Sequence, residues 1–217
     1  MNTNTLAIFD LDFTLLDGDC EMMWSEFLVR RGLLPQAYIR QFEAFNQEYE
    51  LGHMDFPAYA AFIRQPFTEI DPQVVENLRA EYLLEVRRAI RPYMLDRLDW
   101  HMAQQHELIV ITCANRYLAG PIVEAMGIRN LIGTSLELRD GQFVADLNEE
   151  APFREGKVHR LLDWTTSHGF SMQQSWGFSD SQNDLPLLER VAHPVAVTPD
   201  ATLRAVALQR EWEIIEA

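Results

Sequence analysis

Residues 6–14 read Leu-Ala-Ile-Phe-Asp-Leu-Asp-Phe-Thr and give the strongest indication of the fold. The first four residues form a continuous apolar run, which is typical of a strand buried on both faces of a parallel sheet. The run ends at Asp10, and Asp12 follows two residues later. Ligands of open α/β sheets bind beyond the carboxyl ends of the strands. This stretch therefore predicts an α/β protein with a polar site at the end of its first strand.

The remainder of the chain alternates between strand and helix patterns after one long helical segment. We expect strands over residues 108–112, 131–132, 176–179 and 194–197, a hairpin of 136–138 with 142–145, and helices over 93–105, 117–126, 156–168 and from about 184. Strands that alternate with helices imply a parallel sheet with helices on its faces. The predicted fold class is α/β, with a Rossmann-like, doubly wound parallel sheet as the core.

Residues 19–91 show only helical periods. These periods are interrupted at turn-forming residues, namely Pro35, Gly52 with Pro57, Pro66, and Asp71-Pro72. Because this insert follows the first strand, we expect it to cover the carboxyl ends of the strands. The predicted domains are a core of residues 1–16 and 92–217 and an all-helical cap of residues 17–91.

The composition excludes several functional classes. The 217 residues include 18 Lys and Arg against 33 Asp and Glu, a formal net charge of −15 at pH 7, which argues against binding nucleic acids or anionic membranes. Cys20 and Cys113 are too few for a disulfide framework or a cysteine zinc site. There is no long apolar run and no pattern of a signal peptide, so we expect a soluble, cytoplasmic protein. The sequence does not indicate an oligomeric state.

Asp10 and Asp12 have the side chains that phosphoryl transfer requires. Asp10 could attack phosphorus and form an aspartyl phosphate. Asp12 could protonate the leaving oxygen and later deprotonate the hydrolytic water. An acidic loop that caps a helix would show the same triplet, so the prediction depends on residues elsewhere in the chain.

Thr112 and Lys157 are candidate phosphate-binding residues. Thr112 ends a predicted strand, where its hydroxyl and the backbone N–H of Cys113 could donate to phosphate oxygens, although a helix N-cap would also place threonine there. Lys157 follows Gly156 at a helix start, and both a lysine and a helix N-terminus suit a phosphate. A single lysine is more often a solvated surface residue, so neither position is decisive alone.

Asp180 and Asp184 follow the predicted strand 176–179. Asp180, with Asp10 and the backbone carbonyl of Asp12, would form an oxygen site that suits Mg²⁺, which takes few protein carboxylates and keeps several waters. Asp184 could support that site, or it could cap the next helix. Acidic loops after two parallel strands, with the threonine and lysine in order between them, predict a magnesium-dependent enzyme that acts on a phosphate.

The order of these residues resembles the four motifs of the haloacid dehalogenase superfamily, and their spacing resembles its phosphoserine-phosphatase-like subgroup. The resemblance extends over essentially the whole chain, including a helical cap of the C1 type inserted after the first motif. It implies a nucleophile at Asp10, an acid/base at Asp12, phosphate-binding residues at Thr112 and Lys157, Asn183 beside the phosphate, and metal-site residues at Asp10, Asp12, Asp180 and Asp184.

Asp12 distinguishes two chemistries within this superfamily. The dehalogenases that resemble this chain lack the second aspartate, because a departing halide needs no proton, whereas a departing alkoxide does. We therefore expect a phosphatase. A phosphotransferase, in which a substrate hydroxyl replaces water, remains an alternative. A non-catalytic sensor of phosphorylated metabolites is a third, disfavoured because Asp10, Asp12 and Asp180 are all present.

The predicted cap bears on substrate choice. Phosphoserine phosphatases carry a cap glutamate that meets the substrate amine, and Asp19, with Glu21 close by, matches that position here. They also carry a cap arginine for the substrate carboxylate, whereas Ile63 aligns here and Arg64 is one residue away, a helical rotation of about 100°. Histidinol phosphate has an amine and no carboxylate, and proteins resembling this chain include histidinol-phosphate phosphatases. We expect histidinol phosphate as substrate, with phosphoserine as the alternative.

Overall fold

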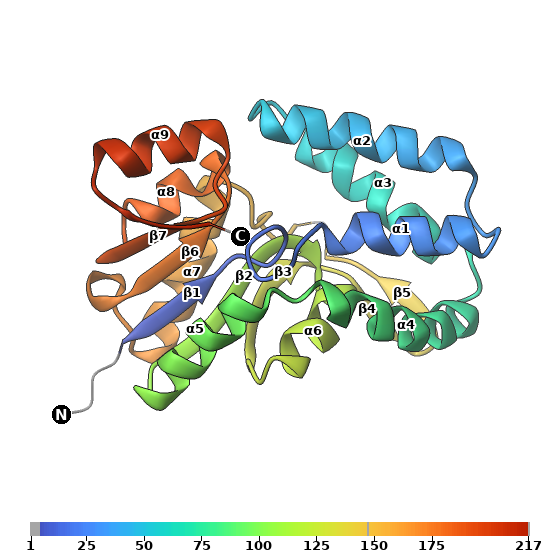
Figure 1. Ribbon diagram of the computed structural model, residues 1–217. Helices are drawn as coiled ribbons and strands as arrows, with labels where there is room; N and C mark the ends of the chain where they lie inside the picture. The colour runs from blue at the N-terminus through green and yellow to red at the C-terminus, as the bar shows by residue number, and fades with distance from the viewer. Residues whose placement is uncertain (1–4, 147, 217) are drawn as a thin grey trace.

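The computed structural model describes residues 5–146 and 148–216 and contains a six-stranded sheet flanked by helices (Figure 1). The strand order is β3-β2-β1-β6-β7-β8, and every neighbouring pair is parallel. The strands are β1 (Leu6–Phe9), β2 (Glu107–Asn115), β3 (Asn130–Thr134), β6 (Trp176–Ser179), β7 (His193–Val197) and β8 (Glu213–Ile215). The predicted α/β class and doubly wound parallel sheet are confirmed.

Strand β1 lies at the centre of the sheet and is covered on both faces. Leu6 and Ile8 pack in one buried cluster with Val158 of α7 (Glu155–His168). Phe9 packs in a second cluster with Met94 of α5 (Pro92–Ala103). Because each face of β1 meets a different apolar layer, all four of its residues are fully buried, which explains the continuous apolar run.

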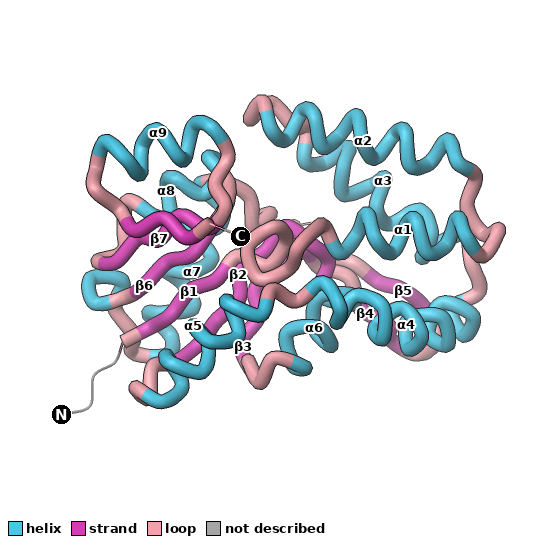
Figure 2. Tube along the Cα trace, in the orientation of Figure 1, coloured by secondary structure: helices cyan, strands magenta, loops and turns pink. Residues whose placement is uncertain are grey.

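Four helices follow β1 and lie together beside the sheet (Figures 1 and 2). They are α1 (Cys20–Arg30), α2 (Gln36–Glu50), α3 (Phe56–Glu69) and α4 (Pro72–Val86). The predicted hairpin is present as β4 (Glu137–Arg139) and β5 (Gln142–Val144). Its Phe143 ring contacts Phe67 of α3, with the ring centres 5.1 Å apart, so the hairpin packs against the helical segment.

The remaining helices surround the sheet. They are α6 (Arg116–Ala125), α8 (Leu185–Leu188), α9 (Ala201–Gln209) and the short 3-10 turns Arg87–Ala89, Met172–Gln174 and Gln182–Asp184. None of the helices in the described part of the chain has the length and hydropathy needed to cross a membrane.

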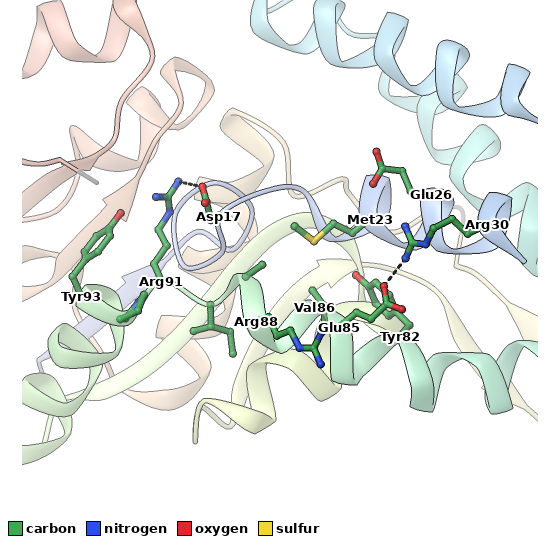
Figure 3. A pocket seen from close by; sticks show the side chains of 13 residues that line it. Asp17, Met23, Glu26, Arg30, Tyr82, Glu85, Val86, Arg88, Arg91 and Tyr93 are labelled. Carbon is green, nitrogen blue, oxygen red and sulfur yellow. Dashed lines mark hydrogen bonds and ion pairs between the residues drawn. The ribbon is translucent and has the colours of Figure 1, made fainter.

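The chain passes between the sheet and the four helices at two adjacent points. Leu16 and Ile90 form an isolated antiparallel bridge there, and Arg91 forms an ion pair with Asp17 at 3.0 Å. A cavity of about 560 Å³ lies beside these crossings and contains none of the predicted site residues (Figure 3). The crossings lie next to the predicted domain boundaries, and the division into core and cap domains stays a prediction.

Helix α3 differs from the expectation that Pro66 ends a helix, because Pro66 lies inside it. Proline has no N–H, so the carbonyl of Phe62, one turn earlier, loses its helical donor. The hydroxyl of Tyr38 donates to that carbonyl instead, at 2.9 Å. A side chain from α2 therefore compensates for the proline, and the helix continues through it.

Strand β2 is longer than expected. It continues beyond residue 112 to Asn115, and its register against β3 shifts between Ile111 and Asn115. Thr112 therefore lies within the irregular last part of the strand and does not follow it. The irregularity lets residues 112–114 leave the regular ladder and approach the end of β1.

Candidate active site

A cavity of about 540 Å³ lies at the carboxyl ends of β1, β2 and β6. These strands are neighbours, with β1 in the middle, so the residues that follow them meet at one edge of the sheet. Six predicted site residues line the cavity: Asp10, Asp12, Asp19, Thr112, Cys113 and Asp180. The other three are buried and do not line it: Lys157, Asn183 and Asp184.

Lys157 is an almost completely buried cation, with 1% of its surface exposed. Its Nζ donates to Asp10 Oδ1 at 2.8 Å and to Asp184 Oδ2 at 2.7 Å. Burial lowers the pKa of Lys157, but the two carboxylates outweigh burial and hold that pKa well above its usual value. Lys157 is therefore charged, and it joins the end of β1 to the turn before α8.

The start of α7 positions Lys157. A Cβ atom on Gly156 would lie 2.0 Å from the carbonyl oxygen of Ala151, so only glycine fits where this loop packs against the helix. Arg154, just before the helix, has a φ of 53°, which is uncommon for a residue with a side chain. The close packing at Gly156 and the positive φ of Arg154 together direct the chain into α7, so that Lys157 lies beside Asp10.

Asp10 is fixed at the end of β1. Its backbone N–H donates to the carbonyl of Phe178 at 2.9 Å, which continues the sheet ladder past the strand. Burial raises the pKa of the Asp10 carboxyl to about 6, with Lys157 opposing the rise and Asp184 adding to it. Above about pH 6 the carboxyl is ionised, which is the state that a nucleophile requires.

Asp12 has the environment of a proton donor. Its Oδ1 accepts from the backbone N–H of Cys20 at 2.8 Å, and its Oδ2 accepts from Thr112 Oγ1 at 3.4 Å. Burial, followed by the charges of Asp19 and Asp10, raises the pKa of Asp12 well above its usual range. A raised pKa favours the protonated carboxyl, which is the form that can donate a proton to a leaving group.

Asp180 and Asp184 have carboxylate oxygens that protein donors only partly satisfy. Thr14 Oγ1 donates to Asp180 Oδ1 at 3.1 Å. Burial, followed by the charges of Asp10 and Asp184, raises the pKa of Asp180 well above its usual value. Asp184 Oδ1 is buried and has no hydrogen-bond partner in the described residues. Buried oxygens of this kind, close to further carboxylates, favour a bound cation.

The donor set fits magnesium better than a metal enclosed by protein. Within residues 5–146 and 148–216, no three His, Cys, Asp or Glu side chains form a group that could hold a metal ion. Mg²⁺ needs fewer protein side chains than this, because it binds through one or two carboxylates and completes its coordination shell with water and phosphate oxygens. Asp10, Asp180 and the backbone carbonyl of Asp12 could supply the protein ligands, and Asp184 could support them.

Thr112 and Cys113 both line the cavity, but their side chains have different hydrogen-bond partners. Thr112 Oγ1 accepts from the backbone N–H of Ala114 at 3.1 Å and donates to Asp12, so it lies beside the candidate acid. Cys113 Sγ donates to the carbonyl of Pro152 at 3.1 Å. Burial raises the pKa of the Cys113 thiol well above its usual value. The thiol is therefore protonated and unsuited to nucleophilic attack.

Asn183 contacts the helical segment and does not line the cavity. Three side chains from the sheet region hold backbone carbonyls at the end of α2: Asn183 Nδ2 donates to Tyr49 at 2.9 Å, Gln182 Nε2 to Glu50, and Arg154 Nη1 to Gly52 at 2.9 Å. Sequence reasoning singled out neither Gln182 nor Arg154. Their partners depend on where α2 ends in space, and no local pattern specifies this.

Of the four residues of the helical segment that bear on substrate choice, one lines the cavity and three do not. Asp19 caps the N-terminus of α1 and lines the cavity. Glu21 is buried behind it and does not reach the cavity. Ile63 is buried, and Arg64 Nε donates to a backbone carbonyl of its own helix at 3.0 Å. Neither Ile63 nor Arg64 lines the cavity, so only Asp19 of these four can meet a substrate there.

Known proteins share both the sequence and the fold. A family model described as haloacid dehalogenase-like hydrolase matches residues 7–189, which include every predicted site residue. A histidinol-phosphatase from Neisseria meningitidis serogroup C is 33% identical over 216 residues, covering 97% of each chain.

Two solved structures show the same architecture. A protein of unknown function from Bordetella pertussis Tohama I superposes with a TM-score of 0.88 at 32% identity, covering 99% of both chains. A substrate-bound phosphoserine phosphatase has the same fold, with a TM-score of 0.72 at 13% identity over 100% of this chain and 95% of that one. On the family match and the similarity to the histidinol-phosphatase, this chain belongs to the haloacid dehalogenase-like hydrolase family, among its phosphatase-type members.

Proposed function

We propose that this enzyme is a magnesium-dependent phosphomonoesterase for a small metabolite phosphate that carries an amino group, with histidinol phosphate as the leading substrate. The observation that carries the proposal is the charge of the cavity wall. Asp19 lines it, and Arg91, the only lysine or arginine on the described wall, is already paired with Asp17 at 3.0 Å. An ammonium group complements this wall, whereas a carboxylate would meet no free cation.

Phosphoserine is the alternative substrate. Its amine would suit Asp19, but its carboxylate would need a cation. Ile63 has no charge, and Arg64 donates to a carbonyl of its own helix and does not line the cavity. The similarity to a histidinol-phosphatase over almost the whole chain supports the same ranking. Histidinol phosphate therefore ranks first because it brings positive charge and no carboxylate.

The first chemical step forms an aspartyl phosphate. The Asp10 carboxylate attacks phosphorus, the bond from phosphorus to the ester oxygen breaks, and that oxygen leaves with the electron pair. Asp12 donates its proton to this oxygen, so the oxygen leaves as an uncharged hydroxyl group of the product alcohol. Lys157, 2.8 Å from Asp10, stabilises the negative charge that passes through the site.

The second step restores the enzyme. Asp12, now ionised, accepts a proton from a water molecule whose oxygen attacks the phosphorus of the aspartyl phosphate. The bond from phosphorus to the Asp10 oxygen breaks, which releases inorganic phosphate and regenerates both carboxyl groups. When bound, Mg²⁺ would neutralise charge on the phosphate oxygens.

The first test is phosphate release from histidinol phosphate, phosphoserine and several sugar phosphates, with Mg²⁺ and again with EDTA. We expect release that requires Mg²⁺ and a kcat/KM that is highest for histidinol phosphate. A preference for phosphoserine would contradict the argument from the missing cation. Transfer of the phosphoryl group to an added hydroxyl acceptor, with no inorganic phosphate released in its absence, would indicate a phosphotransferase, and binding without turnover would indicate a sensor.

The nucleophile can be tested by substituting Asp10→Asn. The amide cannot form the acyl phosphate, so we expect phosphate release to fall below detection while the thermal midpoint and circular dichroism stay close to the parent protein. Activity equal to that of the parent would rule out the proposed mechanism.

A further inference from the structure

We propose that Glu50, at the C-terminal end of α2, is a second substrate-recognition carboxylate at the cavity. The cavity would then select phosphomonoesters with two basic groups in the leaving alcohol, an amine near the ester carbon that meets Asp19 and a second basic group farther out that meets Glu50. This inference rests on the proposed function and specifies which leaving group the enzyme prefers.

The backbone of Glu50 is held firmly against the sheet region. The carbonyls at a helix C-terminus have no partners within the helix. Here Gln182 Nε2 donates to the carbonyl of Glu50, and Asn183 Nδ2 donates to that of Tyr49 at 2.9 Å. Arg154 holds the carbonyl of Gly52 at 2.9 Å. These contacts fix the end of α2 at the cavity, so Glu50 has a defined position there.

The carboxylate of Glu50 is available to a ligand. Glu50 lines the cavity and is exposed, and its side chain makes no hydrogen bond or ion pair with the residues that the structure describes. Asp200, another acidic residue on the wall, is already occupied, because Oδ1 accepts from the N–H of Leu203 and Oδ2 from that of Gln182. Among the described residues, Glu50 is therefore an exposed carboxylate on the cavity wall with no cation or hydrogen-bond donor paired to it.

Asp19 and Glu50 line the same cavity and differ in exposure, since Asp19 is half-buried and Glu50 is exposed. Asp19 lies beside the reacting groups, since it raises the pKa of Asp12 and precedes Cys20, whose N–H binds Asp12 at 2.8 Å. Glu50 lies on α2, where the helical segment meets Gln182. A substrate phosphate at Asp10 would therefore bring a nearby amine to Asp19 and a more distant cation to Glu50.

Four further residues of the helical segment give the cavity wall a surface that suits a flat cationic ring. Tyr49 and Tyr59 contribute aromatic surface, and Leu51 and Met54 contribute apolar surface. A protonated imidazole can stack on aromatic rings and pair with a carboxylate at the same time. Histidinol phosphate has this combination of an amine beside the ester carbon and an imidazole beyond it.

The test compares two substrates that share the first amine. Histidinol phosphate carries the second basic group, and phosphoethanolamine lacks it. KM and kcat are measured for both with the parent enzyme, Glu50→Gln and Glu50→Asp in Mg²⁺. We expect Glu50→Gln to raise the KM for histidinol phosphate about tenfold more than the KM for phosphoethanolamine, with Glu50→Asp in between. Asp19→Asn should raise the KM for both substrates.

Glu48→Gln is the matched control, because Glu48 is also exposed on α2 but does not line the cavity. It should leave both KM values unchanged. An equal change for the two substrates in Glu50→Gln, or no change, overturns the role of Glu50 while phosphatase activity stands. Failure of the parent enzyme to release phosphate from any phosphomonoester overturns the proposed function and this inference together. Thermal midpoints show that each variant is folded.

Discussion

At the scale of single residues, Gly156 allows the close packing that positions its neighbour Lys157 in the site. Substituting Gly156→Ala would place a Cβ atom 2.0 Å from the backbone oxygen of Ala151, so either the loop or the start of the helix that carries Lys157 must shift. We expect a loss of about 3 kcal/mol in the free energy of unfolding and a fall of at least about tenfold in kcat/KM. Chemical denaturation and phosphate-release assays measure the two effects.

Gly120→Ala provides the control for that substitution. Gly120 is also helical, but a Cβ there meets its nearest neighbouring atom at 4.0 Å, which is ordinary contact. Alanine is favoured over glycine within helices by about 0.5–1 kcal/mol, so this variant should be as stable as the parent or slightly more stable. If both variants behave alike, the close approach at Gly156 does not position the lysine.

The residues at the strand ends can be predicted from sequence, and their partners cannot. Asp10, Thr112 and Asp180 each belong to or follow an apolar run, and parallel strands bring such positions to one edge. The contact between Asn183 and the carbonyl of Tyr49 depends on the path of α2 through space. Predicting it would require the packing of four helices on the sheet, which no local pattern describes.

At the scale of elements, a buried carboxylate links two helices to the end of β2. Glu21 of α1 accepts from the backbone N–H of Asn115 at 2.9 Å and from its Nδ2 at 2.6 Å, and from the hydroxyl of Tyr59 in α3. Burial, followed by the charge of Asp19, raises the pKa of Glu21 to about 7. The folded protein thus binds this proton more tightly than the unfolded chain, so the stability that Glu21 contributes falls as pH rises from about 4.5 to 7.

The substitution Tyr59→Phe should therefore lower the free energy of unfolding more at high pH than at low pH. At pH 5.5 Glu21 is mostly protonated, and losing the hydroxyl should cost about 0.5–1.5 kcal/mol of unfolding free energy. At pH 8 Glu21 is ionised, and losing a donor to a buried charge should cost about 1.5–3 kcal/mol. Denaturation of parent and variant at both pH values gives the difference.

Tyr38→Phe serves as the control for this pH dependence. Its hydroxyl is also buried and donates at 2.9 Å, but to the neutral carbonyl of Phe62, so its cost should be the same at both pH values. A cost for Tyr59→Phe that does not change with pH would contradict the titration of Glu21 near neutrality.

Elements with their own periodicity can be predicted, whereas those created by neighbours cannot. The pattern indicates β1, β6 and α7 almost residue for residue. The sequence gives no comparable indication of β8, whose Glu213, Ile214 and Ile215 form a strand by pairing with β7. The continuation of α3 through Pro66 likewise depends on the Tyr38 hydroxyl from another helix. In each case a distant partner overrides the local signal.

At the scale of the whole molecule, long-range repulsion competes with local attraction. The net charge of −15 leaves many carboxylates without a matching cation. Surface ion pairs such as Arg31 with Glu81 and Arg116 with Glu137 oppose this repulsion locally, but each contributes only about 0–1 kcal/mol. A globular chain of this length has a radius of gyration of about 17 Å. At 0.01 M salt, where the screening length is about 30 Å, charges across the whole molecule therefore interact.

Added salt should consequently stabilise this protein. At 0.1–0.2 M the screening length falls to about 10 Å or less, so repulsion between distant carboxylates is removed while pairs at 3–4 Å keep most of their attraction. We expect the Tm to rise by about 2–4 °C between 10 and 200 mM NaCl in EDTA, which corresponds to about 1 kcal/mol for a chain of this size. KCl should have the same effect, because screening does not depend on the identity of the ion. A Tm that falls with salt would mean that the surface ion pairs contribute more than the repulsion between unmatched carboxylates.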